Sequence, residues 1–104
     1  MNVEDFNSNQ KTITAIVDIF VDTLKEEEVV KELCLLDAVE EVYEVTGEFD
    51  IATVVRTEDI DEFRDTLKNK IMKISGVKSV VSSIVLSAAK GQRADQISIE
   101  SQKE

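Results

Sequence analysis

The segment Thr12–Val21 (TITAIVDIFV) constrains the fold most, because it is rich in β-branched residues and apolar on both alternating sets of positions. One set is entirely apolar, and the other places Ile16 and Phe20 beside Asp18. The members of the first set are Ile13, Ala15, Val17, Ile19 and Val21. A strand that is apolar on both faces lies in a sheet whose two faces are both covered. We therefore predict a layered structure with this strand inside it.

Two helices are predicted around the middle of the chain. Thr23 and Glu26 have the spacing of a capping box, and the helix that they begin is expected to run to about Leu36. Thr57 is the expected N-cap of a second helix, and Gly76 is its expected stop. The apolar positions of the second helix recur at helical spacing and are Ile60, Phe63, Leu67, Ile71 and Ile74.

The remaining patterns predict three further strands. Val39–Thr46 and Asp50–Arg56 are joined as a hairpin through Gly47, and Val77–Ser87 is the last long strand. The element order is therefore β-α-β-β-α-β, which is typical of the split βαβ motif. We predict an α+β, ferredoxin-like fold in which an antiparallel four-stranded sheet carries both helices on one face.

The face of the sheet without helices needs another cover. Its expected apolar residues are Ile16 and Phe20, together with Val80, Ile84 and Leu86 of the last strand. A second copy packed sheet to sheet would bury them, so we predict a homodimer. A monomer that uses its tail as a lid is less favoured, because the tail has few apolar residues.

Three regions are expected along the chain. Residues 1–11 form a polar N-terminal segment, and residues 12–90 form the folded domain. Residues 91–104 form a polar tail, in which the alternating segment 96–100 is a candidate for a short edge strand.

The charge of the chain argues against several partners. It carries 12 Lys and Arg against 22 Asp and Glu, a net charge of −10, and no His. Nucleic acids and anionic membranes are not expected to bind directly, because phosphate binding depends on clustered Lys and Arg. No apolar run approaches the roughly 20 residues that span a bilayer, and Met1–Gln10 lacks the apolar core of a signal peptide. We therefore expect a cytoplasmic protein.

Catalytic and metal chemistry find little support in the sequence. Cys34 has no Cys or His companion, and there is no Gly-rich phosphate loop or nucleophile with a credible base. The acidic clusters Glu26–Glu28 and Glu58–Asp61 lack EF-hand spacing and suit the starts of helices. We expect no metal, no cofactor and no enzymatic activity.

The predicted hairpin is the candidate binding site. Gly47 frees the backbone and exposes its N–H groups, and Asp50 offers an acceptor at the same edge. This corner could hold the carboxylate and ammonium of a small zwitterion, but an ordinary hairpin with Asp50 as a cap explains it equally well. Thr46, Glu48 and Phe49 line the same loop, and Phe49 is better explained by packing between subunits.

Three runs resemble the AsnC and leucine-responsive regulator family. Leu36–Asp50 (LDAVEEVYEVTGEFD) ends in the pattern V-[ST]-G-x-[FY]-D, Ile74–Val77 resembles its helix-to-strand turn, and Ser82–Leu86 its final strand. The similarity covers about Thr12 to Glu100. The corresponding domain of the family is called RAM, for regulation of amino-acid metabolism. The resemblance implies the split βαβ fold, dimers joined through their sheets, an octamer of four dimers, and amino-acid effectors bound between dimers.

Two departures from that family affect the expected function. Full-length members carry an N-terminal helix-turn-helix that binds DNA, but only eleven residues precede the first predicted strand, so we expect a stand-alone RAM domain. The last strand of the family carries threonines four and six residues after its glycine, where this chain has Val80 and Ser82. The resemblance thus implies these ligand-binding residues: Thr46, Gly47, Glu48, Phe49, Asp50 and Ser82.

Three classes of function remain. The first is a regulatory domain that binds an amino acid, oligomerises, and modulates amino-acid metabolism or a full-length regulator of the same family. The second is an oligomeric interaction module without a ligand, which the loss of a hydroxyl at Val80 favours. The third is a small dimeric barrel enzyme, which ranks last because no paired catalytic residues are present. We expect the first class.

Overall fold

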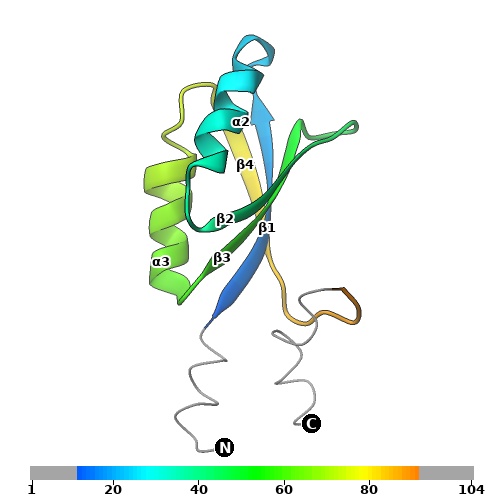
Figure 1. Ribbon diagram of the computed structural model, residues 1–104, viewed down its shortest axis with the longest axis vertical. Helices are drawn as coiled ribbons and strands as arrows, with labels where there is room; N and C mark the ends of the chain where they lie inside the picture. Colours follow the sequence, from blue (N-terminus) through cyan, green and yellow to red (C-terminus); the bar gives the residue numbers. More distant parts are fainter. Residues whose placement is uncertain (1–11, 92–104) are drawn as a thin grey trace, which may run out of the picture.

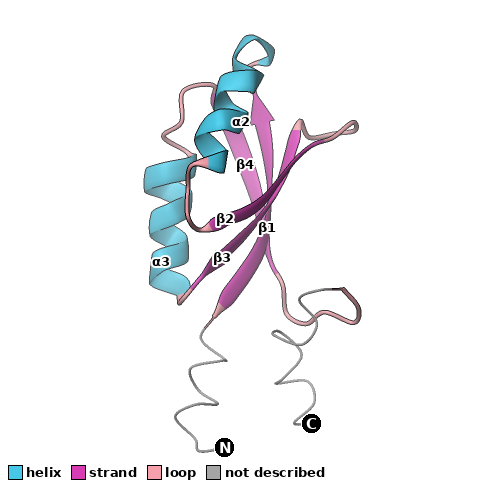
Figure 2. Cartoon of the chain, viewed as in Figure 1, coloured by secondary structure: helices cyan, strands magenta, loops and turns pink. Residues whose placement is uncertain are grey.

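The computed structural model describes residues 12–91 as a four-stranded antiparallel sheet with two helices on one face (Figures 1 and 2). The elements are β1 (Ile13–Val21), the 3-10 turn η1 (Thr23–Lys25), α2 (Glu26–Cys34), β2 (Val39–Glu44), β3 (Ile51–Thr57), α3 (Ile60–Asp65), the π-helical turn η2 (Thr66–Ile71) and β4 (Val77–Ile84). The spatial order of the strands is β2-β3-β1-β4. This confirms the predicted α+β, ferredoxin-like split βαβ fold. The predicted segment 1–11 and the possible edge strand 96–100 lie outside the described residues.

The core lies between the sheet and the helices. The alternation of β1 places Ala15, Val17 and Ile19 fully out of solvent, as predicted, because this face meets α2 and α3. Within residues 12–91 the buried apolar residues are Ala15, Val17, Ile19, Val21, Val29, Leu33, Ile51, Val55, Phe63 and Ile71. No helix between residues 12 and 91 covers the other face of the sheet, and Ile16 is 44% exposed there.

The last strand faces the opposite way from the prediction. Val80 pairs with Ile19 and packs against the core, and Ile84 pairs with Ala15, so both project on the helix side of the sheet. Directly paired residues of antiparallel strands share a face, so the register with β1 decides the orientation, and the sequence of β4 does not reveal that register. On the open face β4 contributes Val81, which pairs with Asp18, between Ser79 and Ser83, which pair with Phe20 and Ile16.

The first helix begins differently from the prediction. Thr23 is not its cap: the side chain of Asp22 accepts a hydrogen bond from the backbone N–H of Leu24 at 3.0 Å. The carboxylate of Asp22, whose backbone is extended, satisfies one free N–H group of this turn; the first turn is 3-10, and α2 follows it.

The second helix also begins later than predicted, because Thr57 is the last residue of β3. The N-cap is Asp59, whose side chain accepts from the N–H of Glu62 at 2.8 Å. The carboxylate of Glu62 in turn accepts from the N–H of Glu58 at 2.7 Å. This reciprocal pair satisfies two N–H groups that the helix leaves free.

The turn between the second helix and β4 depends on Gly76. Its φ is +106°, and an added Cβ would lie 2.7 Å from the Cβ of Lys25 and 3.0 Å from a methyl group of Val29. Its carbonyl accepts from the N–H of Asp22 at 2.8 Å. Gly76 therefore lets this turn pack directly on the start of α2. No helix within residues 12–91 is long and apolar enough to cross a membrane.

Candidate functional site

The candidate site is the loop of residues 45–50 between β2 and β3, which projects from the sheet in Figure 1. It is closed by a hydrogen bond from the N–H of Val45 to the carbonyl of Asp50, at 3.1 Å. The N–H of Asp50 donates to the carbonyl of Ile19 in β1, also at 3.1 Å. The backbone at the base of the loop is thus fixed both to itself and to the central strand.

Asp50 has a structural role within the chain. Its Oδ2 accepts a hydrogen bond from the N–H of Val21 at 2.9 Å, at the last residue of β1. This bond satisfies a backbone donor of the central strand just beyond the Ile19–Ile51 pair. Its carboxylate is half-buried and holds the loop against the sheet. One of the two explanations that the sequence left open, a cap for the backbone, is therefore present in the structure.

Gly47 lies at the exposed tip of the loop. Its φ is +133°, which disfavours residues with a Cβ, and nothing lies within 4 Å of the position that a Cβ would occupy. The neighbouring Thr46 and Glu48 are exposed as well. The conformation of the backbone, rather than crowding, is therefore the reason for glycine here, and the space beside it is open to a ligand.

Phe49 connects the loop with the open face of the sheet. Its ring lies 4.6 Å from that of Phe20, measured between centroids, with 43° between the ring planes. Phe20 projects from β1 on the side away from the helices, since the residues on either side of it are buried beneath them. Any molecule that covers the open face near the end of β1 therefore also meets this aromatic pair.

Ser82 lies apart from the loop within one chain. Ser82 belongs to β4 and pairs with Val17 of β1. Strand β4 lies on the other side of β1 from β3, and Ser82 is exposed. The structure therefore brings Thr46, Gly47, Glu48, Phe49 and Asp50 together and leaves Ser82 on another edge of the sheet. The roles of all six residues in ligand binding stay predictions.

Two acidic residues that the sequence analysis did not assign to the site lie beside the loop. A side-chain hydrogen bond with Glu44 raises the pKa of Glu26, and burial and the charges of Glu44 and Asp50 raise it further. The two carboxyl groups meet because the turn after β1 and the hairpin after β2 lie at the same end of a split βαβ sheet. That topology, combined with the acidic start of the first helix, is the signal that could have located this pair.

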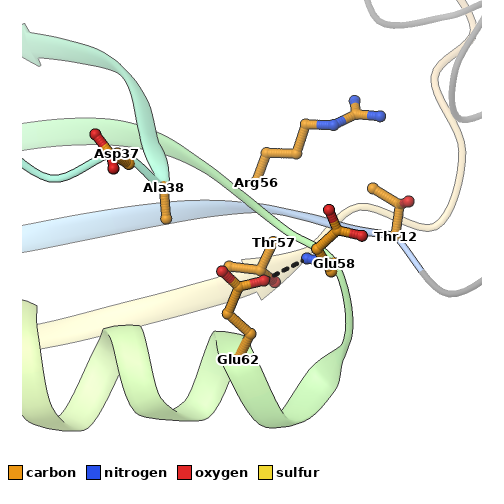
Figure 3. Close-up of a pocket in the computed structure, with 7 residues that line it drawn as sticks. All are labelled: Thr12, Asp37, Ala38, Arg56, Thr57, Glu58 and Glu62. Carbon is orange, nitrogen blue, oxygen red and sulfur yellow. Dashed lines mark hydrogen bonds between the residues drawn. The ribbon is translucent and has the colours of Figure 1, made fainter.

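A surface cavity of about 310 Å³ lies at the opposite end of the sheet (Figure 3). It is lined by Thr12, Asp37, Ala38, Arg56, Thr57, Glu58 and Glu62. In Figure 3 the guanidinium of Arg56 extends away from Glu62, whose carboxylate accepts a hydrogen bond from the backbone N–H of Glu58. None of the predicted site residues lines this cavity. Among the described residues, no group of three or more potential ligands is placed to hold a metal ion.

The sequence matches one known family over most of its length. The profile of the Lrp/AsnC ligand-binding domain matches residues 14–95. The chain is 42% identical over 59 residues to the HTH-type transcriptional regulator LysM of Sulfurisphaera tokodaii, covering 57% of this chain and 41% of that protein. The matched regions span 41% to 49% of the curated relatives, so the chain corresponds to about half of their length.

Solved structures share the fold. TTHA0845 from Thermus thermophilus superposes with a TM-score of 0.71 at 29% identity, over 76% of this chain and 99% of that one. A feast or famine regulatory protein from M. tuberculosis, solved in complex with L-methionine, superposes with a TM-score of 0.68 at 24% identity. That match covers 89% of this chain and 60% of the regulator.

Proposed function

Because the chain belongs to the Lrp/AsnC ligand-binding domain family, we propose that it is a regulatory domain that binds an amino acid and self-associates. The effector binds at the hairpin of residues 45–50, and subunits pair through the open face of the sheet. The relatives are named as transcriptional regulators, which supports a regulatory rather than a catalytic role.

The observation that carries this proposal is the geometry of the hairpin. Asp50 anchors the base of the loop to Val21, whereas the backbone at Gly47 stays exposed beside open space. In the proposal, backbone N–H groups around Gly47 donate to the α-carboxylate of the effector. The acidic side chains of Glu26 and Glu44 favour its α-ammonium at the same end of the molecule. The methionine complex of a neighbour with the same fold supports an amino acid as the ligand class.

The remaining predicted residue completes the site only in an assembly. Ser82 is exposed on the edge strand β4, away from the hairpin of its own subunit. In the proposal, Ser82 approaches the hairpin of a subunit in a neighbouring dimer, as expected for an effector bound between the dimers of an octamer. The net charge of −10 makes direct binding to DNA unfavourable, so the domain acts on transcription through a full-length regulator of the family.

One observation favours a second candidate, an interaction module without a ligand. Val80 stands where the resemblance implies a threonine, and its side chain packs against the core instead of offering a hydroxyl. A chain with such a change keeps the fold and the assembly surface without needing the effector.

Thermal unfolding in the presence of each of the twenty amino acids, at millimolar concentration, separates the two candidates. A ligand at about 100 times its dissociation constant stabilises the folded state by about 2.7 kcal/mol, which raises the melting temperature by several degrees. The proposal predicts one chemically related group of stabilising amino acids. If no amino acid raises the melting temperature, the ligand-binding proposal is wrong and the interaction module replaces it.

A further inference from the structure

Asp18 is a charged residue in the apolar part of the open sheet face. It pairs with Ala52 of β3 on one side and with Val81 of β4 on the other. Ile16 and Phe20 lie two positions before and after it on the same face of β1. Its carboxylate makes no hydrogen bond or ion pair with any other residue between 12 and 91. A lone carboxylate at this position faces whatever covers the sheet.

A second copy of the chain packed on this face would remove water from Asp18. Taking a carboxylate out of water without a partner is strongly unfavourable, so a covering surface that places a cation opposite Asp18 is favoured. Val81 is 48% exposed and Ile16 is 44% exposed, so the apolar surface around the carboxylate gains from being covered. The face therefore suits a partner with an apolar surface and a positive charge opposite Asp18.

The same face carries a suitable cation. Arg56 alternates with the buried residues Val55 and Thr57 of β3, so it projects on the open side. In the four strands the other basic residue is Lys78, which lies at the bulge opposite Phe20 and Val21. A guanidinium has five N–H donors, so Arg56 can keep its interaction within its own chain and still donate to a carboxylate of another subunit.

The strand register places Asp18 and Arg56 so that the open faces of two copies have complementary charges. Asp18 pairs with Ala52, Ile16 with Val54, and Thr14 with Arg56, so the charges lie equally far along the strands from the Ile16–Val54 pair. A two-fold axis between two stacked sheets, crossing the strands at that pair, brings Asp18 of each copy level with Arg56 of the other. The two residues are then offset sideways by one strand, about 4.8 Å, across sheets about 10 Å apart. Side chains reaching inward from both sheets span this gap.

We infer that Asp18 forms an ion pair with Arg56 of the partner subunit, twice in each dimer, and that the two pairs fix the register of the sheet-to-sheet interface. The inference rests on the proposed self-association and adds the residues that orient it. An isologous interface requires this reciprocity, since each contact occurs twice. Buried polar pairs of this kind select one register among the many that an apolar face alone would allow.

Charge reversal tests the pairing by sedimentation equilibrium of the whole chain. Asp18→Arg or Arg56→Asp alone places like charges together and is expected to weaken the dimer by about 100-fold or more. The double variant restores opposite charges and is expected to return the dissociation constant to within about tenfold of the original. Glu32→Arg reverses an exposed charge on the helix side of the molecule and is expected to leave the constant unchanged.

The outcomes separate this inference from the proposed function. A wild-type chain that stays monomeric overturns the proposed self-association and the pairing with it. A dimeric wild type whose double variant stays dissociated overturns the pairing alone. If a reversal variant fails to fold by circular dichroism, Asp18→Asn and Arg56→Gln replace it in a double-mutant cycle. The pairing then predicts that Arg56→Gln weakens the dimer at least about fivefold less in the Asp18→Asn background than in the wild type.

Discussion

The carboxylate of Asp50 accepts a hydrogen bond from the backbone N–H of Val21 at 2.9 Å, and this bond joins the hairpin of residues 45–50 to the end of the central strand. Replacing Asp50 with Ala leaves that partly buried N–H without its partner. We expect the free energy of unfolding to fall by about 1–3 kcal/mol, measured by urea denaturation. The open sheet face is unchanged, so the variant should remain a dimer by sedimentation, whereas its affinity for the effector should fall. A variant with unchanged stability would show that the bond is not formed in solution.

Gly76 and Gly47 should respond differently to replacement by alanine. Gly76→Ala combines a positive φ with a Cβ 2.7 Å from the Cβ of Lys25, so we expect a loss of several kcal/mol or failure to fold. Gly47→Ala meets no atom within 4 Å, so only the backbone strain of about 1–2 kcal/mol remains. Denaturation curves of both variants measure the difference. Equal losses would contradict the open space at the tip of the hairpin.

Thr66 offers a stabilising substitution. It is 1% exposed, and within residues 12–91 its hydroxyl is the buried side-chain group that has no hydrogen-bond partner. Thr66→Val keeps the shape of the side chain and removes the unsatisfied hydroxyl, so we expect the free energy of unfolding to rise by about 1 kcal/mol. Thr53→Val is the matched control, because the hydroxyl of Thr53 donates to the carbonyl of Val17 at 2.9 Å and its removal should destabilise the fold. A destabilised Thr66→Val would indicate a partner for that hydroxyl.

The carboxyl pair beside the hairpin predicts a pH dependence. The hydrogen bond with Glu44 raises the pKa of Glu26 in the folded chain, so the folded state binds more protons there than the unfolded state. This contribution to stability is present below the ordinary pKa of a glutamate and is lost as the pH rises through the raised value. Glu26→Gln should therefore flatten the fall of the melting temperature as the pH rises through this window. Glu28→Gln, an exposed change in the same turn, is the control and should leave the profile unchanged.

The local patterns of the sequence were sufficient for the fold but not for the orientation of every face. The alternation of β1 identified its buried set, because every member of that set is apolar whereas the other set contains Asp18. The edge strand β4 was assigned to the wrong face. Its orientation depends on the register with β1, and this register includes a bulge at Phe20 and Val21. No residue type at these positions predicts the bulge.

The candidate site was predicted in part. Gly47 and Asp50 were identified because a turn residue and an acceptor follow each other in one short loop. The proximity of Glu26 and Glu44 to this loop was missed, since their contact joins segments that are distant in the sequence. The helix caps were also misassigned. Thr23 was predicted where Asp22, one residue earlier, is the cap, and Thr57 was predicted where Asp59, two residues later, is the cap. Several polar residues precede each helix, and the exact end of the preceding strand decides which of them caps it.

Backbone amide chemical shifts, recorded while a stabilising amino acid is titrated into the isotope-labelled chain, test the central claim most directly. Residues 45–50 and the cavity around Glu58 lie at opposite ends of the sheet, so the two sites give separate sets of signals. The account predicts that the shifts change at residues 45–50, Gly47 foremost, and that Gly47→Ala reduces these changes. Shifts confined to the cavity around Glu58, or none with any amino acid, would contradict an effector site at the hairpin.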